Sequence, residues 1–192
     1  MNKRRGNKVR IIAGRLRGRL VTFADHDGLR PTGDRLRETL FSWLQPSLPG
    51  SRSLDMFAGS GVLGFESISR GGSSTVLFEK SAAVGRVLED NVASLGIGEA
   101  DVVCADVLQT GVIERYCDAD SIDIAYIDPP FDAALQQCAA NRLRASGVLA
   151  RDSLVAIENS RHAADLKVPD GWQLKREKVA GEVRLQLFLV AR

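Results

Sequence analysis

The sequence predicts an α/β fold built on a doubly wound, mostly parallel sheet. From residue 51 onward, short apolar runs typical of buried strands alternate with longer stretches whose apolar residues recur at the 3.6-residue period of a helix. A glycine-rich turn follows the first of these strands, as in nucleotide-binding folds of this class. Strands and helices that alternate in this way form a mostly parallel sheet with helices on both faces.

The first 45 residues carry a different pattern. Short strands are predicted at residues 9–13 and 20–23, joined by the arginine- and glycine-rich stretch 14–19, which is typical of a basic hairpin. A helix is predicted from about residue 34 to residue 44, with Thr32 as its cap and Pro46, Pro49 and Gly50 beyond its end. We therefore divide the chain into an N-terminal extension, residues 1–45, and a main domain, residues 51–192.

The main domain is predicted to alternate five strands with four helices. The strands are expected at residues 53–57, 74–79, 100–104, 122–128 and 153–158, and the helices at 62–70, 82–95, 133–145 and, as a short segment, near 107–116. The chain then carries two strand-like runs, residues 172–179 and 183–190, separated by a turn at Ala180 and Gly181. These runs predict an antiparallel hairpin that completes the sheet.

Composition limits the classes of function open to the chain. Of its 192 residues, 44% are apolar and 26% are charged, as in an ordinary soluble globular protein. No apolar run reaches about 20 residues and no signal peptide is evident, so a cytoplasmic protein without a membrane span is expected. The three cysteines form no CxxC pair and the two histidines lie far apart, so we expect neither a metal site nor a disulfide framework.

Charge is distributed unevenly along the chain. Residues 1–37 hold eleven basic and three acidic residues, a net charge of +8, whereas the remainder has a net charge of −6. A basic segment on a mildly acidic body favours a polyanionic partner, and nucleic acid above others; a solvated tail would account for residues 1–8 alone. The arginines that we expect to contact nucleic acid are Arg10, Arg15, Arg17, Arg19, Arg30, Arg35 and Arg37.

A glycine-rich turn and three acids predict the cofactor. The stretch 59–64 fits G-x-G-x-x-G, a weakly specific spacing that lets a nucleotide approach the backbone. Asp55 lies at the end of the first strand, where it would repel a pyrophosphate but could hold an ammonium group. Glu79 ends the second strand, where it could accept ribose hydroxyls, and Asp106 follows the third, beside Val107, where it could accept from an adenine amino group. Three such acids favour S-adenosylmethionine over NAD.

Each acid also has another interpretation. Asp55 could cap the following helix, Glu79 could equally serve NAD, and Asp106 could be a turn residue. Their convergence at the carboxyl edge of one sheet, where ligands bind in this architecture, favours the cofactor site. The residues expected to line it are Asp55, Phe57, Ala58, Gly59, Ser60, Gly61, Glu79, Lys80, Asp106 and Val107.

The stretch from Asp128 to Phe131 predicts where a substrate amine is held. Asp128, Pro129, Pro130 and Phe131 follow a buried strand, and prolines leave rigid carbonyls outside the sheet's hydrogen bonding. A carboxylate and a carbonyl that accept from an exocyclic amine favour the pyramidal nitrogen of a methyl-transfer transition state. Phe131 would stack on a flipped base. The alternative is a loop with Phe131 as core filler. We expect catalytic roles for Asp128, Pro129 and Phe131.

These motifs resemble one family over nearly the whole chain. Residues 10–14 with 17–19, 29–41, 55–64, 128–131 and 176–181 are similar to class I S-adenosylmethionine-dependent methyltransferases, and among them to the bacterial 16S ribosomal RNA guanine-N2 methyltransferases of the RsmD type. The segment 29–41 is the most specific. Adenine-N6 and glutamine-N5 enzymes usually carry Asn at the position of Asp128, so Asp favours guanine.

The resemblance implies a fold, a reaction and a partner. It implies a Rossmann-like, seven-stranded sheet with an antiparallel last strand, behind a small RNA-binding extension. It also implies methylation of one guanine N2 in 16S ribosomal RNA, on the small ribosomal subunit or an assembly intermediate, by a protein that we expect to be a monomer. Family roles fall on Asp55, Gly59, Gly61, Glu79 and Asp106 for the cofactor, and on Asp128, Pro129 and Phe131 for the base.

Three rival functions are distinguishable. An adenine-N6 methyltransferase acting on RNA or DNA would share everything except the base selectivity of the pocket. A dinucleotide-dependent oxidoreductase is disfavoured by Asp55 and by the two prolines. A non-catalytic RNA-binding protein on the same fold is disfavoured by the intact Asp128 and glycines.

Overall fold

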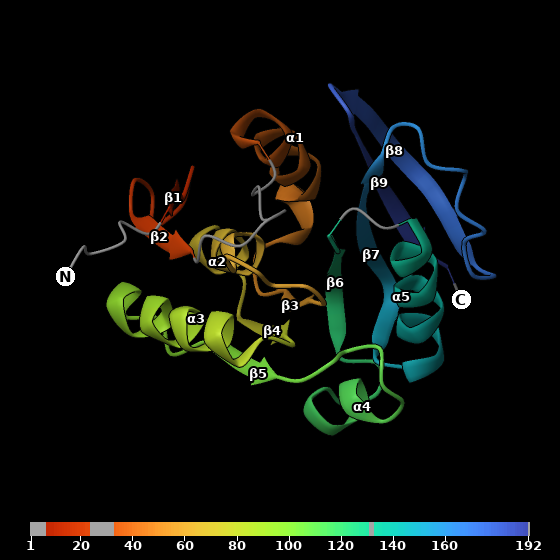
Figure 1. Ribbon diagram of the computed structural model, residues 1–192. Helices are drawn as coiled ribbons and strands as arrows, with labels where there is room; N and C mark the ends of the chain where they lie inside the picture. The colour runs from red at the N-terminus through yellow and green to blue at the C-terminus, as the bar shows by residue number, and fades with distance from the viewer. Residues whose placement is uncertain (1–6, 24–32, 131–132, 192) are drawn as a thin grey trace.

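The computed structural model describes residues 7–23, 33–130 and 133–191 (Figure 1). The strands are β1 (Asn7–Arg10), β2 (Leu20–Phe23), β3 (Arg52–Asp55), β4 (Ser74–Glu79), β5 (Ala100–Cys104), β6 (Ile122–Ile127), β7 (Leu149–Ser160), β8 (Trp172–Ala180) and β9 (Val183–Val190). The helices are α1 (Asp34–Leu44), α2 (Val62–Ser69), α3 (Ala82–Leu95), α4 (Val112–Tyr116) and α5 (Ala133–Ser146), and a short 3-10 helix, η1 (Gln45–Ser47), follows α1.

The main sheet has seven strands in the order β5-β4-β3-β6-β7-β9-β8, and β1 and β2 form a separate antiparallel pair. Neighbouring strands from β5 to β7 are parallel. Strand β9 is antiparallel to both of its neighbours, β7 and β8. The predicted doubly wound sheet with an antiparallel last strand is therefore confirmed, and the C-terminal hairpin completes the sheet as expected.

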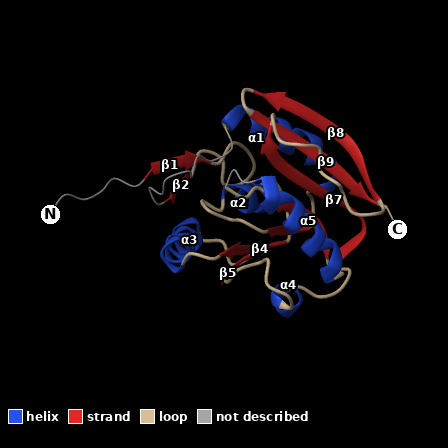
Figure 2. Ribbon diagram, turned by 45° about the vertical axis from the view of Figure 1, so that its right-hand side comes forward, coloured by secondary structure: helices blue, strands red, loops and turns tan. Residues whose placement is uncertain are grey.

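Helices cover both faces of the sheet (Figure 2). Buried residues of α1, α2 and α3 form one apolar cluster against one face, together with Tyr126 of β6 and Leu185 and Leu187 of β9. Buried residues of α4 and α5 form a second cluster on the other face, together with Phe188 of β9. Among the described residues, no helix is long and apolar enough to cross a membrane.

Three predicted boundaries differ from the structure by three residues or more, and others, such as the end of β3 at Asp55, differ by one or two. Strand β1 ends at Arg10, because the chain turns at Gly14 (φ +83°) toward the end of α2. Strand β7 begins at Leu149, four residues before the predicted start, because a bulge near Asp152 (φ +59°) lets it continue to pair with β6. Helix α4 begins only at Val112, after a turn. Thr32, the predicted cap of α1, lies outside the described residues.

The N-terminal extension shares its hydrophobic core with the main domain. Val21 of β2 and Leu40 and Phe41 of α1 are buried in the same cluster as Leu63 and Phe65 of α2. The division at residues 45–51 stays a prediction, but the buried side chains of the two parts form one continuous hydrophobic core. This packing fixes the basic hairpin against the helices α2 and α3 that cover one face of the sheet.

Candidate active site

Four acids follow four neighbouring strands of the main sheet, as the sequence predicts. Asp55 and Glu79 end β3 and β4, Asp106 lies two residues beyond β5, and Asp128 comes directly after β6. These strands are consecutive in the order β5-β4-β3-β6 and parallel, so their carboxyl ends share one edge. This is the edge at which ligands bind in open α/β sheets.

Asp55 is a buried carboxylate that accepts a hydrogen bond from the backbone. Its side chain is 1% exposed, and its Oδ1 accepts from the Phe57 N–H at 3.2 Å. Burial raises the pKa of Asp55 to about 7 against the opposing effect of the Phe57 N–H, and the charge on Glu79 raises it further. No basic side chain of the described segments pairs with it. An ammonium group is the ligand that would offset the cost of this buried charge.

Glu79 holds the glycine-rich turn in place. Its Oε2 accepts from the Gly59 N–H at 3.2 Å, and its Oε1 accepts from the Ser81 N–H at 2.8 Å. The carboxylate thus joins the end of β4 to the turn that follows β3. It is only half-buried, and each oxygen keeps a lone pair that a ligand hydroxyl could use. Its position beside Asp55 agrees with the predicted ribose contact, which stays a prediction.

Two glycines of the motif are required by packing. Gly61 has a φ of +75°, and a Cβ there would lie 2.6 Å from the Phe65 ring and 2.7 Å from Leu88. At Gly64 a Cβ would lie 2.4 Å from Leu77 of β4. The backbone of α2 therefore approaches the sheet closely enough for the turn to lie over the ends of β3 and β4. The other predicted positions in or beside the turn are Phe57, half-buried; Ala58, Gly59 and Ser60, buried; and Lys80, exposed.

Asp106 is a turn residue in the structure, and its predicted adenine contact stays a prediction. Its Oδ1 accepts from the Leu108 N–H at 3.0 Å, which makes it a turn residue. Val107 is 3% exposed and packs in the cluster of α4 and α5. The second carboxylate oxygen of the half-buried Asp106 makes no described hydrogen bond within the chain, so an adenine contact there is compatible with the turn.

The stretch after β6 places Asp128 and Pro129 at the same edge. Asp128 is half-buried, Pro129 buried and Pro130 exposed, while Phe131 lies outside the described residues. Tyr126 of β6 pairs with Asp55 of β3 in the parallel register. Asp128 therefore lies two residues further toward the carboxyl edge of the sheet than Asp55. An amine held by Asp128 would therefore lie next to a cofactor anchored at Asp55.

The predicted RNA contacts divide into exposed and buried arginines. Arg37 is fully buried, so its assignment as an RNA contact is wrong. Its guanidinium donates to the Arg10 carbonyl at 2.7 Å and to Asp34 at 3.0 Å, and the helical register that buries Leu40 also buries Arg37. Arg30 lies outside the described residues. The exposed members of the set, whose RNA contacts stay predictions, are Arg10, Arg15, Arg17, Arg19 and Arg35.

Known proteins resemble this chain over almost its whole length. Residues 9–189 match the family model described as Conserved hypothetical protein 95. The chain belongs to this family. It is 40% identical over 185 residues to Ribosomal RNA small subunit methyltransferase D of Escherichia coli, covering 94% of this chain and 89% of that protein. The protein of the same name from Haemophilus influenzae is 35% identical over 181 residues, covering 94% and 93% of the two chains.

Solved structures agree with the observed topology. An Escherichia coli structure that is 36% identical superposes with a TM-score of 0.86, over 97% of this chain and 99% of that one. A ribosomal RNA methylase from Streptococcus thermophilus, 12% identical with a TM-score of 0.63 over 84% and 100% of the two chains, shares the fold alone. The Conserved hypothetical protein 95 member described here thus has the Rossmann-like fold of class I methyltransferases.

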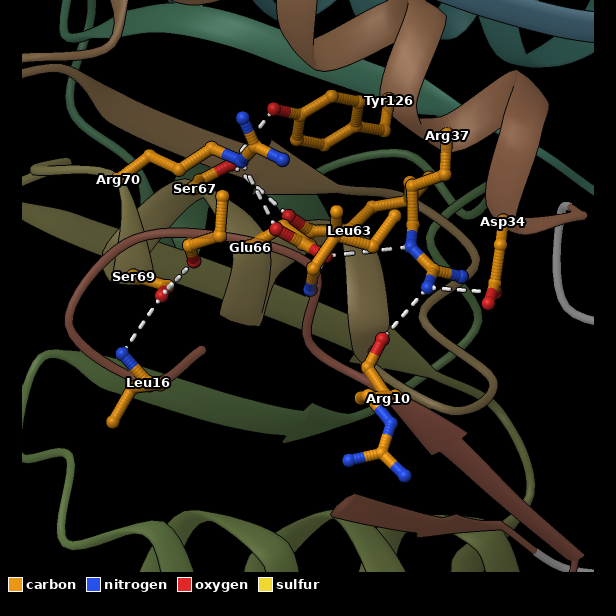
Figure 3. A network of polar contacts seen from close by, with 12 residues as sticks. Arg10, Leu16, Asp34, Arg37, Leu63, Glu66, Ser67, Ser69, Arg70 and Tyr126 are labelled. Carbon is orange, nitrogen blue, oxygen red and sulfur yellow. Dashed lines mark hydrogen bonds and ion pairs between the residues drawn. The ribbon is translucent and has the colours of Figure 1, made fainter. Parts of the chain in front are cut away.

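A buried polar network attaches the extension of this family member to α2 (Figure 3). Glu66, which is 0% exposed, lies between the guanidinium of Arg37, at 3.5 Å, and that of Arg70, at 3.0 Å. Its Oε1 also accepts from the Ile12 N–H at 2.6 Å. One carboxylate therefore joins the segment after β1, helix α1 and helix α2, the helix that begins at the glycine-rich turn.

A second contact of this network reaches β6, the strand that Asp128 follows. The Ser67 hydroxyl donates to the Leu63 carbonyl at 3.0 Å, so in its 2.7 Å bond with Tyr126 the phenol is the donor. Burial raises the pKa of Tyr126, which keeps the phenol neutral. The ring of Phe41 of α1 packs against the Tyr126 ring, with centroids 6.1 Å apart. Helices α1 and α2 are thus both fixed to β6.

Glu66, Ser67 and Tyr126 were not singled out from the sequence. The available signal for Glu66 was an acid within a helix whose other residues are apolar or small, since all eight residues of α2 are buried. Such an acid either faces solvent or has a buried cation as its partner. Its partners are distant in sequence, so the sequence pattern does not distinguish these two cases.

Proposed function

We propose that this protein is an S-adenosylmethionine-dependent methyltransferase that methylates the exocyclic N2 amine of a guanine in small-subunit ribosomal RNA. The observation that carries the proposal is the row of acids: Asp128 follows β6, the strand next to β3, two residues beyond the level of the buried Asp55, which pairs with no basic side chain of the described segments. Its relatives at 35–40% identity are named for methylation of small-subunit ribosomal RNA. We extend the proposal to a monomeric, cytoplasmic enzyme that acts on the subunit or on an assembly intermediate.

The residues present fit the cofactor. S-adenosylmethionine supplies a methyl group on a sulfonium centre and leaves as the neutral thioether. Asp55 would hold the ammonium of its amino acid part, and Glu79 would accept its ribose hydroxyls. Asp106 would accept from the adenine amino group. A raised pKa at Asp55 suits this role, because a bound ammonium stabilises the ionised carboxylate.

The proposed chemistry at Asp128 is orientation with electrostatic stabilisation. The Asp128 carboxylate and the Pro129 carbonyl accept the two N–H bonds of the guanine amine and direct its lone pair at the methyl group. One N–H bond is replaced by an N–CH3 bond, and the released proton passes to solvent. Positive charge develops on the nitrogen as the bond forms, so a fixed carboxylate stabilises the transition state more than the ground state.

The test is the identity of the methylated nucleoside. Small subunits that lack the modification are incubated with the protein and methyl-labelled S-adenosylmethionine, and the RNA is digested to nucleosides. We expect labelled N2-methylguanosine. Labelled N6-methyladenosine would show the rival adenine enzyme, and binding of NADH without S-adenosylmethionine in a calorimetric titration would show a dinucleotide enzyme.

A matched pair of variants tests the role of Asp128. Loss of a transition-state acceptor of this kind lowers kcat by about 10²- to 10³-fold. Asp128→Asn is expected to do so with RNA binding unchanged, whereas Asp101→Asn, an exposed carboxylate on β5, should leave the rate unchanged. Equal rates in the two variants would contradict the assignment.

A further inference from the structure

Strand β8 is exposed along almost its whole length. It forms one edge of the main sheet (Figures 1 and 2). Of its nine residues only Trp172 is buried. The side chains on both faces of β8 are therefore exposed to solvent from Gln173 onward, even though its partner strand β9 is largely buried. The unpaired backbone N–H and C=O groups of a long, exposed edge strand can form β-pairs with other chains unless charged side chains prevent it.

Three cations protect this edge, and none of them has a partner among the described residues. Lys175, Arg176 and Lys178 make no hydrogen bond or ion pair with any residue in the segments that the structure describes. Unpaired surface cations are ordinary when they are scattered. Three within four residues of one strand form a concentrated positive charge that would attract an anion.

The acids nearest in the chain do not neutralise these cations. Glu177, Glu182 and Asp165 already have other partners, and Glu177 lies on the opposite face of β8 from Arg176 and Lys178. These pairs are Glu177 with Gln186 at 2.8 Å, Glu182 with His162 at 3.0 Å and Asp165 with Arg184 at 2.7 Å. The fourth acid of the hairpin and of the loop before it, Asp170, precedes the first residue of β8, five residues before Lys175.

The strand register places Lys178 level with Asp128. Lys178 pairs with Leu185, which pairs with Glu158 of β7. Glu158 lies one residue beyond the last pair between β7 and β6, and so does Asp128. Three strand spacings separate the two positions, a distance of about 14 Å at about 4.8 Å each. That distance corresponds to about four base steps of a nucleic acid strand at 3.4 Å each.

The cations also lie on the same face of the sheet as the basic hairpin. Arg176 pairs with Leu187 and Lys178 with Leu185, and both leucines belong to the cluster that includes α1, β1 and β2. Tyr126 belongs to the same cluster, and Asp128 continues its side of β6 two residues later. The β1–β2 pair and β8 therefore lie on opposite sides of β6, the strand that Asp128 follows (Figure 1).

We propose that Arg176 and Lys178 form a second phosphate-binding surface for the substrate RNA, on the far side of the target base from the basic hairpin. This inference rests on the proposed function only in taking the substrate to be RNA. A strand bound at both surfaces would be held on either side of the nucleotide at Asp128. Contacts to phosphates position the RNA without reading its sequence.

The test is the salt dependence of RNA binding. The double variant Arg176→Gln/Lys178→Gln is titrated with 16S ribosomal RNA transcribed in vitro, over a series of salt concentrations. Loss of two phosphate contacts lowers the slope of log K against log salt by about 1.4 for single-stranded RNA and about 1.8 for a duplex. We expect a decrease in this range, with weaker binding at low salt and unchanged binding of S-adenosylmethionine.

The matched control is Arg115→Gln/Arg144→Gln, which removes two exposed cations of α4 and α5 on the opposite face and should leave the slope unchanged. An unchanged slope in the Arg176/Lys178 variant overturns the proposal. So does an unchanged slope combined with weaker binding to intact small subunits, because that result indicates a protein contact. The measurement needs no methyl transfer, so a failure to find N2-methylguanosine leaves this result standing, and an active enzyme with an unchanged slope refutes this surface alone.

Discussion

Replacing Glu66 by glutamine is expected to lower the free energy of unfolding by about 3 to 5 kcal/mol, the usual cost of breaking a buried ion pair by removing one partner. Glu66 and Arg37 are both 0% exposed, and the carboxylate also faces Arg70 at 3.0 Å. Glutamine keeps the shape of the side chain, so the packing of α2 is preserved. What is lost is the negative charge between two guanidiniums, so the buried charge of Arg37 keeps the exposed Asp34 as an ion-pair partner but loses the buried one.

This loss is large relative to the stability of a domain. Native proteins are stable by roughly 5 to 15 kcal/mol, so Glu66→Gln removes about a third of the total. For a chain of this size, 1 kcal/mol corresponds to a change of about 2 to 4 °C in Tm, and the expected decrease is therefore about 6 to 20 °C.

Urea unfolding followed by circular dichroism measures the effect, and Glu99→Gln provides the control. Glu99 pairs with Arg15 at 2.6 Å, but both side chains are more than a third exposed. A surface pair of this kind contributes about 0 to 1 kcal/mol. If both variants lose less than about 1 kcal/mol, Glu66 does not neutralise the buried arginines, and the reasoning is refuted.

Three further predictions follow from the candidate site. Affinity for S-adenosylmethionine should rise from pH 5 to pH 7 as Asp55 ionises, and fall again above about pH 8 as the ligand's own amino group loses its proton; in Asp55→Asn, calorimetry should show weaker binding without the rise. Gly61→Ala should lower the free energy of unfolding by about 2 to 5 kcal/mol, because it combines a left-handed backbone with overpacking. Gly96→Ala, at φ +68° with open space around it, should lower it by only about 1 to 2 kcal/mol. Equal losses of the two variants in urea unfolding would contradict this reasoning. Tyr126→Phe should lower the free energy of unfolding by about 0.5 to 1.5 kcal/mol, since one hydrogen bond to Ser67 is lost. Ser67→Ala should then destabilise the Tyr126→Phe variant less than it destabilises the unmodified protein.

The sequence correctly predicted that the four acids lie at one edge of the sheet, because the relevant signals are local. Each acid follows a short apolar run, and parallel strands bring their carboxyl ends together without further information. The buried network was not predictable in the same way. Glu66 contacts the Ile12 N–H, 54 residues away in the chain, and only the packing of α1 on the sheet brings them together.

Arg37 shows the limit of charge counting. In a segment of many arginines, one that pairs with a buried acid looks the same as one that faces solvent. The periodicity of α1 contained the distinction, because Arg37 lies between Leu36 and Leu40 on the buried side. Strand β7 shows a different limit, since its extension back to Leu149 depends on a bulge against β6 that no residue pattern indicates.

The common core of the extension and the sheet has a consequence for dissection of the enzyme. A fragment beginning at residue 51 would uncover the apolar surface of α2 and β6 and leave the Glu66 carboxylate without Arg37. Such a fragment should aggregate rather than serve as a minimal catalytic unit. By the same reasoning, grafting the basic hairpin of one relative onto the sheet of another requires α1 and α2 to be transferred with it. The basic hairpin and the sheet edge that carries the four acids therefore belong to one fold that cannot be divided at residue 51.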